Sequence, residues 1–170
     1  TPNGYVTMVN KEIVVTATGE IQDFVVYDDF TKIQISKIDI ETRELISDAK
    51  MHIEDEDGNI IETWTTTNNT HLITNLVAGK TYYIVEDKAP DGYVKADKIK
   101  ITIKNTGEIQ EFVMEDDFTK VDITKTDLVN GSPVIGAKLA IFDEQGNKIA
   151  EWVTSKDAYR INRLSKGKYT

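Results

Sequence analysis

Three ionisable side chains, Lys37, Glu86 and Asp116, fall on faces of predicted β-strands that are otherwise apolar. Successive side chains of a strand point to opposite faces, so residues two apart share a face. The apolar residues that share these faces are Ile33 and Ile35 for Lys37, Tyr82 and Ile84 for Glu86, and Phe112, Met114 and Phe118 for Asp116. All three ionisable groups therefore point toward one core, where unpaired ions would cost several kcal/mol each.

An amine and a carboxyl group that are held together away from water can condense to an amide. Burial favours the neutral amine of Lys37, which can attack, and the protonated carboxyl group of Asp116, which is electrophilic. Glu86 would carry protons and polarise the Asp116 carbonyl, while the folded strands replace a bimolecular encounter. The expected product is an amide between Lys37 and Asp116, formed once per molecule with loss of one water, so we do not expect a turnover enzyme. The alternative is a buried ion cluster of the same residues without a covalent bond.

The elements that must position these groups repeat along the chain at a constant spacing of 88 residues. Matched pairs are Tyr5 and Tyr93, Gly19 and Gly107, Asp28 and Asp116, Lys37 and Lys125, Gly58 and Gly146, Trp64 and Trp152, and Gly79 and Gly167. A constant spacing without drift indicates tandem copies of one domain. The predicted organisation is the C-terminal part of one repeat at residues 1–30, a complete repeat at 31–117 and the N-terminal part of a further repeat at 118–170.

Within each repeat, apolar residues alternate with period two over short runs, such as TKIQISKID at 31–39 and IKITIKN at 99–105. Turn sequences separate the runs, including DEDGN at 55–59 and APDGY at 89–93. We therefore predict an all-β fold of tandem small antiparallel β-sandwiches, Ig-like, with about seven strands in each repeat. The repeats meet at the strip DDFTK without a flexible spacer, which predicts a stiff rod.

The composition excludes several classes of function. The chain has 170 residues, a formal net charge of −9 and no Cys. The negative charge argues against nucleic acid and anionic membrane as partners, and no apolar run approaches the roughly 20 residues of a transmembrane helix. His52 and His71 lack a second ligand at metal-binding spacing, and the acidic turn at 54–57 lacks the spaced ligands of a calcium loop. We therefore expect no metal and no cofactor.

The segments ISKID, GNIIETW, YYIVEDKAPDGY and FVMEDDF together resemble the collagen-adhesin B-type, or SpaA-type, prealbumin-like domains of Gram-positive pilins and adhesins. The domain behind the Spy catcher and tag pair is similar to the same segments. The resemblance covers the whole chain and implies an isopeptide bond from Lys37 to Asp116, with Glu86 as its catalyst. It also implies parallel first and last strands and an extracellular place on the cell surface or cell wall. Glu115 departs from the apolar residue usual beside the reactive Asp, and parity favours Asp116 over the adjacent Asp117.

The partial repeats carry counterparts of the reactive residues, Lys125 in 118–170 and Asp28 in 1–30. Neither residue has a partner in its own partial repeat, and the two partial repeats together lack only the strand that corresponds to residues 84–88. They could complement one another head to tail between chains, which would place Lys125 near Asp28 of a neighbour. The boundaries could equally reflect processing or design.

The function that these features favour is a structural stalk segment whose repeats each contain one internal bond and contact the adjacent repeats. One alternative is an adhesin module that binds a host extracellular-matrix protein or a glycan through its loops. Another is an engineered split or permuted ligation scaffold. A binding module would be expected to expose an aromatic or apolar patch on its loops, and the absence of an aromatic-rich loop favours the stalk.

Overall fold

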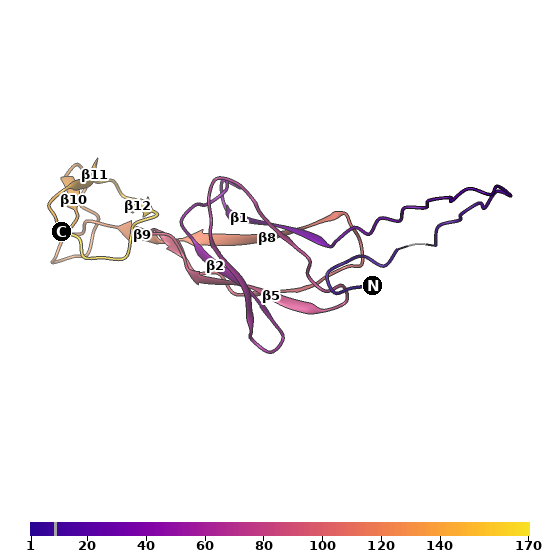
Figure 1. The fold of residues 1–170 in the computed structure, drawn as a ribbon. Coiled ribbons are helices and arrows are strands. Elements are labelled where there is room, and N and C mark those ends of the chain that lie inside the picture. Colours follow the sequence, from indigo (N-terminus) through magenta and orange to yellow (C-terminus); the bar gives the residue numbers. More distant parts are fainter. Residues whose placement is uncertain (9) are drawn as a thin grey trace.

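The computed structural model describes residues 1–8 and 10–170, so residue 9 of the predicted unit 1–30 lies outside the described residues. The strands are β1 (Lys32–Asp39), β2 (Lys50–Asp55), β3 (Ile60–Thr65), β4 (His71–Thr74), β5 (Thr81–Lys88), β6 (Tyr93–Val94), β7 (Ile99–Thr102), β8 (Ile109–Phe118), β9 (Lys120–Ile123), β10 (Lys138–Phe142), β11 (Lys148–Val153) and β12 (Tyr159–Asn162). They form an elongated molecule with the N-terminal residues at one end and β9 to β12 at the other (Figure 1). The prediction of an all-β sandwich fold is confirmed. The described residues contain no helix that is long and apolar enough to cross a membrane.

Strands β1 to β8 form two four-stranded sheets, with the orders β4-β1-β8-β6 and β3-β2-β5-β7. The two sheets pack face to face around one apolar core. The core residues are Ile33, Ile35, Ala49, Met51, Ile53, Ile73, Leu76, Tyr82, Ile84, Ile101, Ile103 and Met114. The complete repeat thus has eight strands rather than about seven, because the two-residue strand β6 pairs with the end of β8.

The first and last strands of this repeat, β1 and β8, lie side by side and run parallel. The other strand pairs of the repeat are antiparallel. Because β1 and β8 point the same way, the chain enters the repeat at one pole and leaves it at the opposite pole, as Figure 1 shows. Tandem repeats with this topology therefore follow one another end to end.

The C-terminal unit repeats the first four strands at the same spacing in sequence. β9 pairs with β12 antiparallel, as β1 pairs with β4, and β10 pairs with β11, as β2 pairs with β3. The Tyr159 to Ile123 register of the C-terminal unit reproduces the His71 to Ile35 register of the complete repeat. The internal repeat read from the sequence is therefore a repeat of strand pairing.

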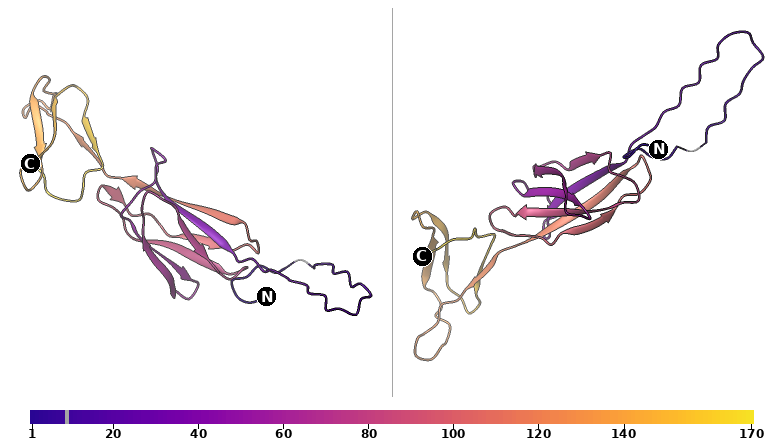
Figure 2. Two further views of the ribbon diagram at one scale, coloured as in Figure 1. Left: turned by 45° about the horizontal axis from the view of Figure 1, so that its top comes forward. Right: turned by 60° about the horizontal axis from the view of Figure 1, so that its bottom comes forward.

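The described part of residues 1–30 contains no strand. Its one regular backbone pairing is an isolated bridge between Tyr5 and Phe30, which corresponds to the pairing of Tyr93 with Phe118. Residues 10–29 make a long excursion away from the complete repeat (Figure 2). Several apolar side chains on this excursion are exposed, among them Ile21, Val25, Val26 and Tyr27.

Candidate functional site

The structure brings Lys37, Glu86 and Asp116 together inside the complete repeat. Lys37 lies near the end of β1, Asp116 near the end of β8, and Glu86 on β5 of the facing sheet. The exposed fractions are 3% for Lys37 and 0% for both acids. The predicted strand parity thus places all three groups in the core.

The strand register determines which atoms meet. Lys37 is opposite Met114 in the parallel ladder, and Asp116 is opposite Asp39. Lys37 therefore reaches diagonally to the residue two positions further along β8 on the same face. Its Nζ atom is in direct contact with Oδ1 of Asp116 and lies 3.3 Å from Oε2 of Glu86.

The same oxygen of Glu86 accepts a hydrogen bond of 2.7 Å from the backbone N–H of Ala96. This bond fixes the carboxylate next to the amine. The sequence offers no signal for it, since every residue except Pro supplies a backbone N–H.

The pKa of Asp116 is raised to about 6, and burial is the largest cause. Glu86 also acts to raise this pKa, while the hydrogen bond and the charge of Lys37 act to lower it. Oδ2 of Asp116 and Oε1 of Glu86 are buried and accept no hydrogen bond within the described chain. An unsatisfied buried carboxylate oxygen is costly and protonation lowers that cost, so burial increases the fraction of Asp116 in the carboxylic acid form that an amine can attack.

A pocket of about 100 Å³ opens beside the amine, and its lining includes Lys37, Met51, Trp64, Thr66 and His71. The ring of Trp64 stacks on that of His71, with the ring centroids 4.4 Å apart. Trp64 is thus a partly buried residue that packs against the core. The pocket has room for a few water molecules beside Lys37.

The other candidate residues lie outside this cluster. Asp28 and Lys125 are exposed, and they lie in the segments before β1 and after β9. These segments lie at opposite poles of the complete repeat (Figure 1), so the structure does not bring the two residues together within one chain. Asp117 points away from the core and pairs with Lys120 at 2.6 Å. Parity therefore selects Asp116 over Asp117.

The positions that we considered as metal ligands are ordinary strand and turn residues. His52 on β2 contacts Asp87 at 2.9 Å, and His71 on β4 contacts Glu62 at 2.7 Å. Asp55 of the acidic turn accepts hydrogen bonds from the turn itself. Across residues 1–8 and 10–170, no group of three His, Cys, Asp or Glu side chains is placed to hold a metal ion.

The sequence matches the family described as SpaA, prealbumin-like fold domain, over residues 31–117 and over residues 119–170. The chain belongs to this family. The resemblance seen in the sequence is thereby confirmed, and the junction between the two matched SpaA domains falls within the DDFTK strip.

Among solved structures, this SpaA-family chain is similar to the Bacillus anthracis TIE protein, with 25% identity and a TM-score of 0.58 over 99% of this chain and 33% of that one. It is also similar to BcpA, the major pilin subunit of Bacillus cereus, with 24% identity and a TM-score of 0.46 over 52% and 30% of the two chains. The shaft pilin SpaA of Lactobacillus rhamnosus GG shows 17% identity and a TM-score of 0.44 over 52% and 47%. This chain spans about a third of the TIE structure. No curated protein sequence matches it.

Proposed function

We propose that residues 31–117 form an autocatalytic isopeptide bond between Lys37 and Asp116, and that the chain is a stalk segment of a Gram-positive surface protein. The observation that carries the proposal is the fully buried contact of an amine with a carboxyl group whose pKa is raised to about 6. Membership of the SpaA family of prealbumin-like domains, together with the resemblance of the sequence to domains of Gram-positive pilins and adhesins, supports the stalk and an extracellular place at the cell wall.

The cluster already holds the protons that the reaction needs. A Lys37 ammonium beside two carboxylates carries the same protons as a neutral amine beside one carboxylic acid and one carboxylate. Transfer of one proton from Nζ to Asp116 therefore produces the reactive pair without exchange with solvent. Burial favours the pair that carries fewer charges.

In the proposed reaction, Nζ of Lys37 attacks Cγ of Asp116 and a carbon–nitrogen bond forms. Glu86, whose Oε2 lies 3.3 Å from Nζ, accepts one proton from the nitrogen. It returns this proton to the hydroxyl oxygen of Asp116, and the carbon–oxygen bond breaks with release of water. Glu86 ends as the carboxylate with which it began, so its role is that of a proton carrier.

The parallel pairing of β1 and β8 explains what the bond would achieve. Tension enters at the start of β1, passes along this strand to Lys37, crosses to Asp116 and leaves through Phe118 two residues later. The chain between Lys37 and Asp116, which are 79 residues apart in sequence, would then carry no tension. No hydrogen-bonded ladder between these two residues has to resist the tension.

The intact mass of the purified chain under denaturing conditions tests the bond. We expect a mass one water below the calculated value, restored to that value in Lys37→Ala and still one water low in the control Asp117→Ala. If the parent chain had the calculated mass, the three residues would form a buried ion cluster without a covalent bond. That result would favour the alternative of a module that binds a matrix protein or a glycan.

For a polypeptide of these 170 residues, we also propose head-to-tail complementation between chains. Within the described residues β9 pairs only with β12, whereas its counterpart β1 has both β4 and β8 as neighbours. Residues 21–30 correspond to β8 and are available to fill this edge, with Val26 at the position of the buried Met114. Asp28 of one chain would then approach Lys125 of the next.

Sedimentation over a range of concentrations tests this complementation. We expect association that Val26→Asp abolishes and that the matched control Val25→Asp leaves intact, because Val25 corresponds to the exposed Val113. A parent chain that stays monomeric, or equal effects of the two variants, would refute the proposal.

A further inference from the structure

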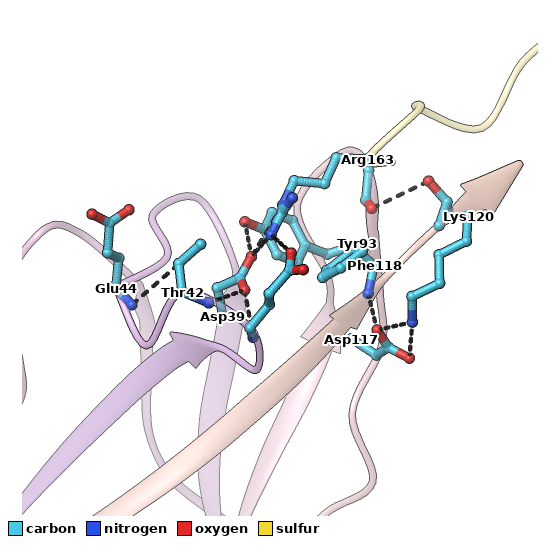
Figure 3. A network of polar contacts seen from close by, with 11 residues as sticks. Asp39, Thr42, Glu44, Tyr93, Asp117, Phe118, Lys120 and Arg163 are labelled. Atoms are coloured by element: carbon cyan, nitrogen blue, oxygen red, sulfur yellow. Dashed lines mark hydrogen bonds and ion pairs between the residues drawn. The ribbon is translucent and has the colours of Figure 1, made fainter. Parts of the chain in front are cut away.

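A polar cluster joins the complete repeat to the unit that follows it (Figure 3). Arg163, in the turn after β12, donates hydrogen bonds of 2.7 and 3.1 Å to Oδ2 of Asp39. Tyr93 donates a third bond to the same oxygen at 2.9 Å. The Arg163 guanidinium also lies 4.0 Å from the ring centre of Phe118, and its Nη2 atom is 3.2 Å from Glu41. The cluster thus contacts the ends of β1, β6 and β8 at the exit pole.

The acceptor of this cluster is built into the complete repeat. Asp39 is 2% exposed, and its Oδ1 accepts the backbone N–H groups of Glu41 and Thr42 at 2.8 and 3.0 Å. Burial acts to raise the pKa of Asp39, but the hydrogen bonds from Thr42 and Arg163 outweigh it and hold that pKa well below its usual range. The carboxylate is therefore charged, oriented and shielded from water where Arg163 meets it.

The backbone contacts of this junction recur at the start of the complete repeat. Thr119 N–H donates to Gly92 O at 3.0 Å, and Arg163 N–H donates to Thr119 O at 2.9 Å. The corresponding bonds are Thr31 N–H to Gly4 O and Asn75 N–H to Thr31 O, both at 3.0 Å. The hydroxyl groups of Thr119 and Thr31 each donate a bond of 2.6 Å, to Leu164 O and Leu76 O respectively.

The two junctions carry different side chains at the position of Arg163, and residues 1–30 include no counterpart of Asp39. Arg163 and Asn75 correspond in the repeat and share a left-handed backbone, with φ of 61° and 65°. Within the described chain, the amide group of Asn75 donates only to its neighbour Thr74. The Arg163 side chain instead crosses the junction to Asp39, which is 124 residues away in sequence.

We propose that the exit pole of a repeat is a docking socket for the following repeat, and that Arg163, Asp39 and Tyr93 latch this junction in one orientation. The partner that the socket fits is a repeat with Arg at the position of residue 163. A repeat with Asn at that position would dock through the backbone contacts alone, which leaves the angle between repeats less restricted. This inference does not depend on the isopeptide bond.

The absence of Cys from the sequence permits a direct test with spin labels on introduced Cys residues. Lys100→Cys on β7 and Val153→Cys on β11 are exposed sites on the two sides of the junction. We expect a narrow distance distribution in the parent chain. Arg163→Asn, which copies the residue of the other junction, should broaden it roughly twofold or more, since small polar interfaces between domains permit relative motion.

A matched control separates loss of the latch from damage to the C-terminal unit. Arg160→Asn removes a bidentate ion pair with Asp122, at 2.6 and 2.7 Å, that lies wholly within that unit. We expect this control to retain the narrow distribution. If the distance distribution of Arg163→Asn were as narrow as that of the parent chain, or if the control broadened equally, the proposed role of Arg163 at the junction would be refuted. Intact mass measured on the same samples reports the isopeptide bond, so failure of one proposal can be distinguished from failure of the other.

Discussion

Replacement of Glu86 by Gln changes the proton carrier and keeps its shape. The Gln carbonyl oxygen can still accept the Ala96 N–H, which now bonds to Glu86 at 2.7 Å. Lys37 and Asp116 remain in contact, so packing of the core should persist. We expect the isopeptide bond to be absent or to form slowly, and the mass to stay at the calculated value.

The size of the stability change follows from the topology. A bond between Lys37 and Asp116 closes a loop of 79 residues in the unfolded chain. By the chain-entropy relation used for disulfides, a loop of this length stabilises the folded state by about 4.5 kcal/mol. For a domain of this size, that free energy corresponds to roughly 20 to 35 °C in Tm. Glu86→Gln should therefore unfold at a temperature lower by this amount.

Thermal and urea unfolding, with intact mass measured on the same samples, provide the assay. Glu111→Gln on the exposed face of β8 is the matched control, and it should keep both the loss of water and the parent Tm. Full bond formation in Glu86→Gln at the parent rate would refute the role of Glu86. A variant without the bond but with a free energy of unfolding within about 1 kcal/mol of the parent would refute the loop-closure argument.

Two further predictions concern pH and the junction. Lys37→Met lacks the bond and the group that lowers the pKa of Asp116, so this pKa should exceed the value of about 6 seen beside Lys37. A raised pKa of Asp116 stabilises the fold at low pH. The free energy of unfolding, measured with urea, should therefore fall by about 3 kcal/mol as the pH rises from about 4 to about 6. A free energy of unfolding that does not change over this range would contradict the prediction. Gly92→Ala places a Cβ atom 2.5 Å from Arg163 O at a φ of 87°, and amide exchange should show faster exchange of the Arg163 N–H. Gly58→Ala, with φ of 81° and no atom within 4 Å, should leave that exchange unchanged.

Much of the candidate site could be read from local patterns. Alternation places Lys37 on the face of Ile33 and Ile35, and the structure buries all three. The face of a side chain depends only on strand geometry, which neighbouring residues determine. The eighth strand was not predicted because β6 has only two residues, which are too few to show an alternating pattern.

The sequence by itself determined the repeat, the strand faces and the three ionisable groups that point into one core. The tertiary structure alone decided their partners, including the diagonal contact of Lys37 with Asp116 and the backbone N–H of Ala96 on Glu86. Only the structure paired Arg163 with Asp39, although a comparison of the repeats could have drawn attention to Arg163 opposite Asn75. Alternation specifies a face and not a neighbour, because the register between strands distant in sequence depends on the packing of the whole sandwich.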